Sequence, residues 1–346
     1  MTSRAAASTA VPHAVSRPVS IKEVAAAAGV SVGTVSNVLN RPEAVAEPTR
    51  ERVLAAVHDL GFVRNESARQ LRAGRSRLVG CIVYDVGNPF FTDVAKAAEG
   101  ALQQQGLAMV LCDSDRDPQK ELRYLELLEQ QRVSGILIAP TDAAAPHLRA
   151  IRQRGTPVVL VDRAGRLADG SSIAVDDVAG GRAVMHHLQT MGHERIAFVG
   201  GPFDVAQVRD RHKGMTSEGH VDVFETTALD IEQGRSAAAD VLARPARSRP
   251  TSIACANDLL AIGVLQHLLE AGVRVPEDIA LVGYDDIDFA SAAAVALSSV
   301  RQPRAELGRG AAELLLRADG RHRSRLLQPE LVVRASSEHR RRRRSR

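Results

Sequence analysis

SIKEVAAAAGVSVGTVSNVLN, from Ser20 to Asn40, is the stretch that decides how the first part of this chain folds. Its S-x-x-E start is the spacing of a capping box, which predicts a helix beginning after Ser20. One apolar face of that helix follows at Ile21, Val24, Ala25 and Ala28. Gly29 predicts the end of the helix, because a left-handed residue often closes one. A tight turn then leads to a second helix capped by Ser31.

The second and third helices complete a small three-helix unit. Val35, Val38 and Leu39 form the predicted inner side of the second helix. The third helix is expected to start near Pro48, with its inward side formed by Val53, Val57 and Leu60, and to end at Gly61. The other face of the second helix is small or polar and has no carboxylate, which suits close approach to DNA. An ordinary three-helix bundle that binds a peptide is the alternative.

The charge of the chain is unevenly divided, although its net value is only +4. Residues 1–77 contain 11 basic and 6 acidic residues, and the tail from Arg340 to Arg346 has six arginines. The stretch 78–339 therefore carries −7. Basic ends suit a polyanion such as DNA. The arginine tail, residues 338–346, is equally well explained as a solvated end.

The composition favours a cytoplasmic protein of two or three domains. No run reaches the roughly 18 apolar residues that span a bilayer. Residues 1–18 lack the apolar segment of a secretory signal, and we expect them to be a disordered leader. Cys81, Cys112 and Cys255 lie in apolar runs without metal-ligand spacing, which predicts buried thiols.

From Leu78 onward, short apolar runs alternate with helix-length segments. Continuous Val/Ile/Leu runs of this kind are typical of parallel sheets covered on both faces. The predicted strands are LVGCIVY, AMVLCD, GILIAP, PVVLVD, SIAVDD, RIAFVG, VDVFETT, SIACAN and IALVGYD. Since these are too many for one compact sheet, we expect two doubly wound subdomains divided near Asp176.

The ends of these strands are rich in polar side chains, and ligands of doubly wound sheets bind there. Asp and Asn are also common helix caps, which explains at least half of them equally well. The residues concerned are Asp85, Asn88, Asp113, Asp162, Arg163, Asp176, Asn257, Asp258, Asp285 and Asp286.

The order of motifs resembles the LacI/GalR family of bacterial transcription regulators. After the opening stretch come TRERVLAAVHDLGF and NESARQLRAGRSRLVG, then NPFF, VDR, GHERIAFVGGP, AND, VPEDIALVGYDD and SSVRQP. The resemblance covers about residues 19–337. It implies a helix-turn-helix DNA-binding domain (19–64), a hinge (65–77) and a two-lobed module like a periplasmic binding protein (78–337). The first lobe is expected to hold 78–175 and 303–318, and the second 176–302 and 319–337.

The resemblance also assigns the DNA contacts. Val32, Gly33 and Asn37 match base-reading positions, which fits a valine against a thymine methyl and an amide on a base edge. The implied phosphate contacts are Ser31, Thr34, Ser36, Asn40, Thr49 and Arg50. In the hinge, Leu71 matches a leucine that wedges into the minor groove, and Arg72 is its basic neighbour. A linker leucine packed on the core is the alternative for Leu71. The family commonly has proline where this chain has Arg64.

The resemblance places an effector between the two lobes. Its implied contacts are Asn88, Phe90, Phe91, Asp162, Arg163, Arg211, Asn257, Asp258 and Asp285. Such side chains grip vicinal hydroxyls, so a carbohydrate is our first expectation, with nucleobases and nucleosides as alternatives. Two departures bear on this pocket. The segment after Arg211 is several residues short, which predicts a trimmed or lost helix, and Val205, Val208 and Ala254 stand where polar or aromatic contacts are common.

The expected function is that of a homodimeric repressor on a pseudo-palindromic operator, with an effector that controls the affinity for DNA. Release of DNA on effector binding is the favoured direction. No cofactor or catalytic residue is predicted, because phosphate-binding and nucleophile motifs are missing from the sequence. His186, His187 and His193 are better explained as solvated residues than as a metal site. A sugar-binding protein without a DNA role, and a protein partner as effector, remain open alternatives.

Overall fold

The structure is a computed structural model that describes residues 17, 19–63, 76–141, 144–164, 170–317 and 319–338. The chain forms two compact units, residues 1–73 and 74–346, and each is described by itself. Three of the expectations fall outside the described residues: most of the leader, residues 65–75 of the hinge with Leu71 and Arg72, and the arginine tail from residue 339.

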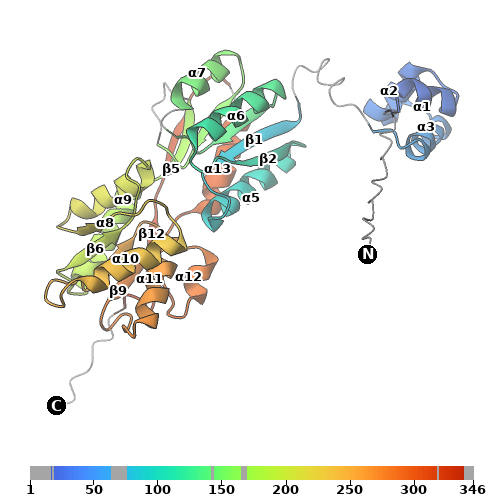
Figure 1. Cartoon of the computed structure of the whole chain (residues 1–346). Coiled ribbons are helices and arrows are strands. Elements are labelled where there is room, and N and C mark those ends of the chain that lie inside the picture. Colours follow the sequence, from blue (N-terminus) through green and yellow to red (C-terminus); the bar gives the residue numbers. More distant parts are fainter. Residues whose placement is uncertain are drawn as a thin grey trace, which may run out of the picture. The chain divides into compact units, whose positions relative to one another are not determined.

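The regular structure in the described part of the first unit is entirely helical, as its sequence predicts (Figure 1). Its elements are α1 (Ile21–Ala28), α2 (Val32–Asn40), the short 3-10 helix η1 (Pro42–Ala44) and α3 (Glu47–Asp59). The capping box is formed, because the backbone N–H of Ser20 donates to Glu23 Oε2 at 2.6 Å and the Ser20 side chain accepts from the N–H of Glu23. Gly29 closes α1 with a φ of 64°, in the left-handed region that favours glycine.

The core of this unit is small and aliphatic. Val24, Val35 and Val53 are fully buried, one from each helix, so the three helices share a single centre. The expected inward position of Leu60 is wrong. Leu60 follows the last residue of α3 and is 37% exposed, and the inner position on that helix belongs to Ala56.

The second unit contains two six-stranded sheets, which define a first and a second lobe. The first sheet has the strand order β11-β5-β4-β3-β1-β2, and all its pairs are parallel. Its strands are β1 (Leu78–Val83), β2 (Ala108–Asp113), β3 (Gly135–Ile138), β4 (Val158–Val161), β5 (Ser171–Val175) and β11 (Ser324–Leu327).

The second sheet has the order β12-β10-β9-β8-β6-β7, and only its edge strand β12 runs antiparallel to its neighbour. Its strands are β6 (Ile196–Val199), β7 (Asp222–Phe224), β8 (Ser252–Cys255), β9 (Ala280–Asp285), β10 (Ser298–Arg301) and β12 (Glu330–Val332). All nine strands predicted from apolar runs are present, β1 to β9 in chain order.

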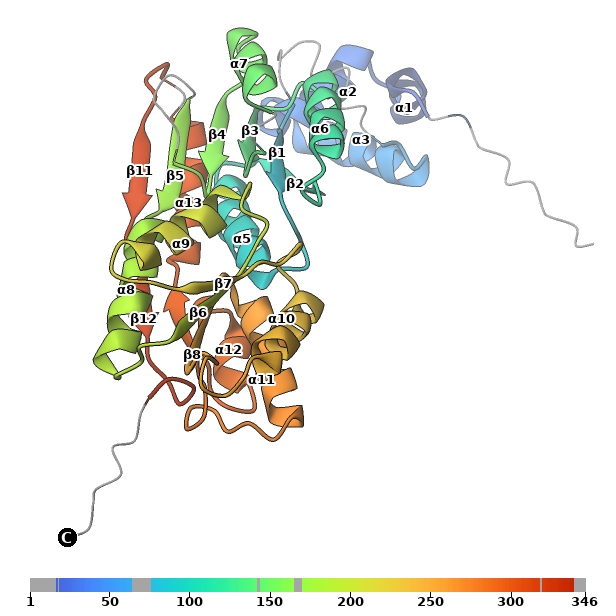
Figure 2. The same ribbon diagram turned by 60° about the vertical axis from the view of Figure 1, so that its left-hand side comes forward.

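Helices cover both sheets, as the continuously apolar strands require. The first lobe has α5 (Pro89–Gln103), α6 (Pro118–Gln130), α7 (Ala145–Gln153) and α13 (Arg304–Leu316). The second lobe has α8 (Asp177–Thr190), α9 (Ala206–Thr216), α10 (Ile231–Ala243), α11 (Asp258–Glu270) and α12 (Asp288–Ala292). In the second lobe α8 and α9 lie on one side of the sheet, and α10 and α11 on the other (Figures 1 and 2). The segment after Arg211 has therefore lost no helix.

The chain passes between the lobes three times: after β5, after β10 and after β11. The expectation that residues 319–337 all belong to the second lobe is wrong for β11. This strand pairs in parallel with β5, Ser324 opposite Ser172, and forms the edge of the first sheet (Figure 2). Its sequence, SRLL, is too short to reveal by itself which sheet edge it joins.

Two glycines let α8 and α9 cross closely. A Cβ at Gly181 would overlap the carbonyl oxygen of Arg211, and a Cβ at Gly214 would overlap that of Val178. This crossing sets α9 deep against α8 and fixes where the buried Arg211 enters the space between the lobes.

The remaining sequence expectations concern thiols and membranes. Cys81, Cys112 and Cys255 are free and buried, as predicted, and burial raises the pKa of each thiol. Among the described residues, no helix has both the length and the apolar character to span a bilayer.

Candidate functional site

The exposed face of α2 is the candidate DNA-contacting surface. Val35 and Val38 turn inward, while Val32, Gly33 and Asn37 are exposed, with 41% of Val32 open to solvent. Ser31 caps the helix, because its Oγ accepts a hydrogen bond of 3.0 Å from the N–H of Thr34.

The polar side chains of this face differ in how they are engaged. Asn40 Nδ2 donates to Ser36 O at 2.8 Å and to Ser36 Oγ at 3.2 Å, so this pair is held within the helix. Arg50, at the start of α3, forms an ion pair with Glu47. Asn37, by contrast, is exposed and makes no side-chain hydrogen bond within the described part of the chain. Its amide is therefore available to a base edge.

A cavity of about 180 Å³ lies between the two lobes of the second unit, and we call it the inner cavity. It is found where the sheets present the ends of their strands, as expected for doubly wound folds. Seven of the nine predicted effector residues line it: Asn88, Phe90, Phe91, Asp162, Arg211, Asn257 and Asp285. The lining also includes Tyr84, Asp85, Asp115, Arg116, Val205, Gln207, Ala228, Leu229 and Asp230.

Both asparagines in the lining, Asn88 and Asn257, are also helix caps. Asn88 Oδ1 accepts from the N–H of Phe90 at the start of α5, and Asn257 Oδ1 accepts from the N–H of Leu260 in α11. These two residues therefore cap helices and also line the inner cavity. Their capping bonds fix the side chains, which leaves the amide groups in defined places at the cavity wall.

The centre of the inner cavity wall is the guanidinium of Arg211. It lies 2.8 Å from Asp177 Oδ1 and 3.6 Å from Asp285 Oδ1, and it donates to Ala256 O at 2.6 Å. Its Cζ atom is 3.8 Å from the centre of the Tyr284 ring. Burial opposes the charge of Arg211, but the carboxylates of Asp177 and Asp285 outweigh it and raise the pKa. Arg211 is therefore charged at every physiological pH.

The carboxylates that line the cavity outnumber its cations, and two of them have raised pKa values. Burial raises the pKa of Asp285 to about 6, although Arg211, Gln302 and Asn88 favour its ionised form. Burial and the neighbouring charge of Asp177 raise the pKa of Asp162 as well. A ligand that donates hydrogen bonds to these oxygens would relieve the cost of burying them.

A bridge between Asp162 and Gln207 joins the lobes at this cavity. Gln207 Nε2, on α9, donates to the backbone oxygen and to Oδ2 of Asp162, which follows β4. Both residues are buried, yet Asp162 Oδ1 and Gln207 Oε1 accept no hydrogen bond among the described residues. Asp162 also has a φ of 54°, and such strain is often kept at ligand sites. Two buried acceptors thus lack donors in one cavity wall.

Aromatic rings supply the apolar part of the wall. Phe90 and Phe91 meet edge to face with ring centres 5.0 Å apart, and Tyr84 meets Phe91 at 5.7 Å. Val205 lies in the lining as its sequence position indicates, whereas Val208 and Ala254 are core residues.

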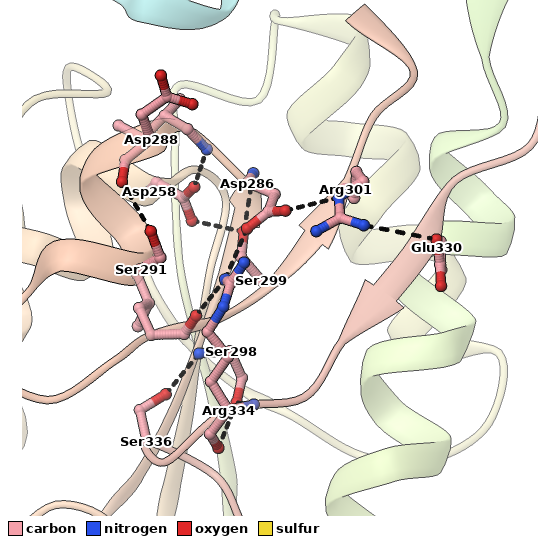
Figure 3. A network of polar contacts seen from close by, with 12 residues as sticks. Asp258, Asp286, Asp288, Ser291, Ser298, Ser299, Arg301, Glu330, Arg334 and Ser336 are labelled. Atoms are coloured by element: carbon pink, nitrogen blue, oxygen red, sulfur yellow. Dashed lines mark hydrogen bonds and ion pairs between the residues drawn. The ribbon is translucent and has the colours of Figure 1, made fainter.

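Asp258 is not brought to the cavity, and its expected role in effector binding is not supported. Its Oδ1 accepts from Ser299 Oγ at 2.6 Å and its Oδ2 from the N–H of Ile287 at 2.9 Å, so the carboxylate holds β9 to β10 inside the second lobe. Figure 3 shows this contact beside Asp286, whose carboxylate binds Arg301 at 2.8 Å and Arg334 at 2.6 Å. The Asp258 and Asp286 carboxylates therefore stabilise the strands next to two interlobe crossings.

Arg163 lies outside the inner cavity as well. It lines an adjoining space of about 450 Å³, the outer chamber, and its Nη1 donates to Pro140 O at 3.3 Å. The lining residues that the sequence did not reveal are chiefly Tyr84, Arg116, Gln207 and Asp230. Of these four, only Asp230 had a local sequence signal, because it caps a helix. The positions of the other three depend on how distant parts of the chain meet.

The described histidines are not grouped as a metal site would require. Among the described residues, no group of three or more His, Cys, Asp or Glu side chains is arranged to hold a metal ion. His187 Nε2 lies 2.8 Å from Ser337 Oγ, and His193 Nδ1 lies 3.1 Å from Thr251 Oγ1, so both take part in local hydrogen bonds.

Two protein families match the chain. The family described as "Bacterial regulatory proteins, lacI family" matches residues 20–65, which contain α1 to α3. The family described as "Periplasmic binding proteins and sugar binding domain of LacI family" matches residues 76–335, which contain both lobes.

Individual proteins match over nearly the same span. The HTH-type transcriptional repressor PurR of Photobacterium profundum is 34% identical over 91% of this chain and 98% of that protein. The ribose operon repressor of Bacillus subtilis is 37% identical over 86% of this chain and 90% of that protein. The solved structure of the lac repressor dimer bound to operator and the anti-inducer ONPF has 27% identity and a TM-score of 0.80, and covers 93% of this chain and 100% of that one.

Proposed function

Because this chain belongs to the LacI family of bacterial regulatory proteins, we propose that it represses transcription from a pseudo-palindromic operator and that a carbohydrate effector releases it. Two copies of the chain, associated through their two-lobed units, would place two DNA-reading helices on the two half-sites. Repression of this kind takes place in the cytoplasm, where the chromosome lies.

The DNA-reading part of the proposal rests on α2. Its exposed face bears Val32, Gly33 and Asn37 and no carboxylate, so nothing on it repels phosphate. We assign these three residues to the base edges. Ser31, Thr34, Ser36, Asn40, Thr49 and Arg50 are assigned to phosphates, with Leu71 and Arg72 as minor-groove contacts.

The proposal of a carbohydrate effector rests on two unpartnered acceptors in the wall of the inner cavity, Asp162 Oδ1 and Gln207 Oε1. Leaving such buried oxygens unpartnered costs free energy, which a ligand that supplies O–H or N–H groups would recover. A sugar supplies several hydroxyls, and Arg211 and Asn257 can accommodate the hydroxyl oxygens. The excess of carboxylates over cations argues against an anionic effector at this position.

Coupling follows from the position of the cavity between the lobes. Asp162 belongs to the first lobe and Gln207 to the second, so a molecule bound to both changes the free energy of the arrangement of the lobes. If that arrangement differs between the DNA-bound and free states, effector and operator affinities are linked.

The test has two stages. The full-length protein selects its operator from a random DNA pool, and fluorescence anisotropy then follows the complex as sugars are added. We expect a symmetric selected sequence and release by at least one sugar. Selection of no symmetric sequence would refute the repressor role.

The same titration distinguishes the alternative effectors. Release by adenine or guanine but by no sugar would assign the cavity to a nucleobase. Operator binding that responds to neither class would favour a protein partner.

A further inference from the structure

We propose that the effector is an uncharged glycoside, with its sugar ring in the inner cavity and its second ring in the outer chamber against Arg116. This inference rests on the proposed function and specifies its ligand. It begins from the size of the inner cavity, because 180 Å³ is below the roughly 300–1,000 Å³ of typical ligand pockets. A single ring suits that volume better than a larger molecule does.

The outer chamber adjoins the inner cavity. The two share four lining residues, Tyr84, Asp115, Arg116 and Val205, so a ligand can pass from one to the other along a common wall. The outer chamber adds about 450 Å³, and it is also formed by both lobes, since Thr141 comes from the first and Pro202 from the second. A second ring attached to the first would find space there.

Arg116 stands at the common wall with an unused donor. Its Nη1 atom is buried and makes no hydrogen bond among the described residues. A buried donor without an acceptor costs free energy unless a ligand or water satisfies it. The inner cavity thus has unpartnered acceptors, at Asp162 and Gln207, and its boundary with the outer chamber has an unpartnered donor.

The backbone at Arg116 has a strained conformation, which holds its side chain at the wall that the two spaces share. Asp115 and Arg116 have φ values of 51° and 53°, both in the left-handed region. The loop is anchored to the end of β1, because the N–H and Oγ of Ser114 both donate to Val83 O, at 2.9 and 3.0 Å. Two consecutive non-glycine residues in this conformation are costly, and such strain is typical of ligand clamps.

The charges of the outer chamber favour a neutral second ring. Its lining includes two carboxylates, Asp115 and Asp204, and two arginines, Arg116 and Arg163. Arg163 donates to Pro140 O and keeps its positive charge, so the two arginines balance the two carboxylates. The lining therefore offers a phosphate no excess of positive charge. An uncharged ring can instead bond to these groups through its hydroxyls and pack on Pro118, Pro202 and the Tyr84 ring.

The test measures binding to the full-length protein by calorimetry. The probes are ribose, glucose, sucrose, cellobiose, maltose, adenosine and glucose 6-phosphate. We expect at least one uncharged glycoside to bind at least about tenfold more tightly than the monosaccharides, because it gains contacts in the outer chamber. In the disaccharides the second ring is a sugar, whereas in adenosine it is a nucleobase, so comparing their affinities shows which kind of second ring the outer chamber accepts.

The Arg116→Ala variant tests the second contact. The substitution should lower the affinity for the glycoside about tenfold and the affinity for monosaccharides less than about twofold, because only the glycoside reaches Nη1 of Arg116. Arg123→Ala, on α6 with a side chain 66% exposed, is the matched control and should change neither.

Two results would overturn the inference and leave the proposed function standing: monosaccharides that bind as tightly as every glycoside, or equal losses for both ligand classes in Arg116→Ala. Tightest binding of glucose 6-phosphate would overturn it by showing that the outer chamber takes an anion. If no probe bound while operator binding persisted, both the carbohydrate effector and this inference would fail.

Discussion

Gln207 of the second lobe donates hydrogen bonds to two oxygens of Asp162 in the first lobe, at 2.5 Å to the backbone carbonyl and 3.0 Å to Oδ2. The bridge crosses the inner cavity wall and leaves one oxygen of each side chain unpartnered. The same pair of residues thus connects the lobes and offers hydrogen-bond acceptors to a ligand.

Replacing Gln207 should weaken the response to effector. Gln207→Ala removes an acceptor and the interlobe bridge, and a neutral hydrogen bond contributes about 1 kcal/mol, so effector affinity should fall about fivefold. Operator affinity without effector should change little. Gln189→Ala is the matched control, since Gln189 also donates to a backbone oxygen, Glu218 O, but lies outside the cavity. Equal effects of the two variants in an anisotropy titration would contradict the role of Gln207.

The raised pKa of Asp285 predicts how stability depends on pH. Burial raises this pKa from 3.8 to about 6, so the folded protein holds the proton more tightly than the unfolded chain does. The stabilising contribution is full below pH 4 and is lost as pH rises through 6, and it amounts to about 3 kcal/mol at 1.36 kcal/mol per unit. Urea unfolding of the wild type and Asp285→Asn between pH 4 and 7.5 measures it.

In this comparison, the wild type should lose stability relative to Asp285→Asn as the pH rises. Asp240→Asn, on the exposed side of α10, controls for the loss of a carboxylate in general. If the difference in unfolding free energy between wild type and Asp285→Asn stayed constant from pH 4 to 7.5, the raised pKa of Asp285 would be refuted.

We expect the glycine at position 33 to be needed for operator binding but not for the stability of the domain. A Cβ at this position would meet only Ser31 Oγ, at an ordinary 3.5 Å, and its φ is not in the left-handed region. Gly33→Ala should therefore stabilise the domain slightly, by at most about 1 kcal/mol, and weaken operator binding about tenfold or more by obstructing close approach. Thermal unfolding and anisotropy measure the two effects separately.

The control for this variant is Gly100→Ala in α5, where a Cβ has open space as well. It should leave the affinity for operator unchanged. An unaltered affinity in Gly33→Ala would mean that the helix does not approach the bases at this residue.

Asn37 should determine base preference at one position of each half-site. Its exposed amide makes no hydrogen bond within the described residues, and an amide that reads a base discriminates by about 1–3 kcal/mol. Asn37→Ala should therefore bind a broader set of sequences in a selection from random DNA. Thr49→Ala, at an assigned phosphate contact, should lower affinity evenly. An even loss in Asn37→Ala would remove it from the base-reading set.

Local patterns were enough to predict most of the fold. The capping box at Ser20, the left-handed Gly29 and the apolar strand runs each depend on a few neighbouring residues, and each is found in the structure. Features whose position depends on residues far away in the sequence were harder to predict. Leu60 has an apolar side chain but no core to enter, and the four residues of β11 do not reveal which sheet they join.

The candidate site was predicted only in outline, for the same reason. Polar residues at strand ends were expected to meet, and most of them do, but Asp258 turns into the second lobe because Ser299 and Ile287 engage its carboxylate. Gln207 and Arg116 reach the inner cavity through the crossing of α8 and α9 and through a strained loop. Neither arrangement has a sequence signature at the residue itself.

The three passages of the chain between the lobes mean that neither lobe is a single continuous segment. The first lobe is assembled from pieces that end with β11, near the end of the described chain, so a shortened gene product that stops after β5 would lack both α13 and an edge strand. The first sheet is therefore complete only after the chain has also supplied five of the six strands of the second sheet. Three connections between the lobes also limit how far the lobes can separate.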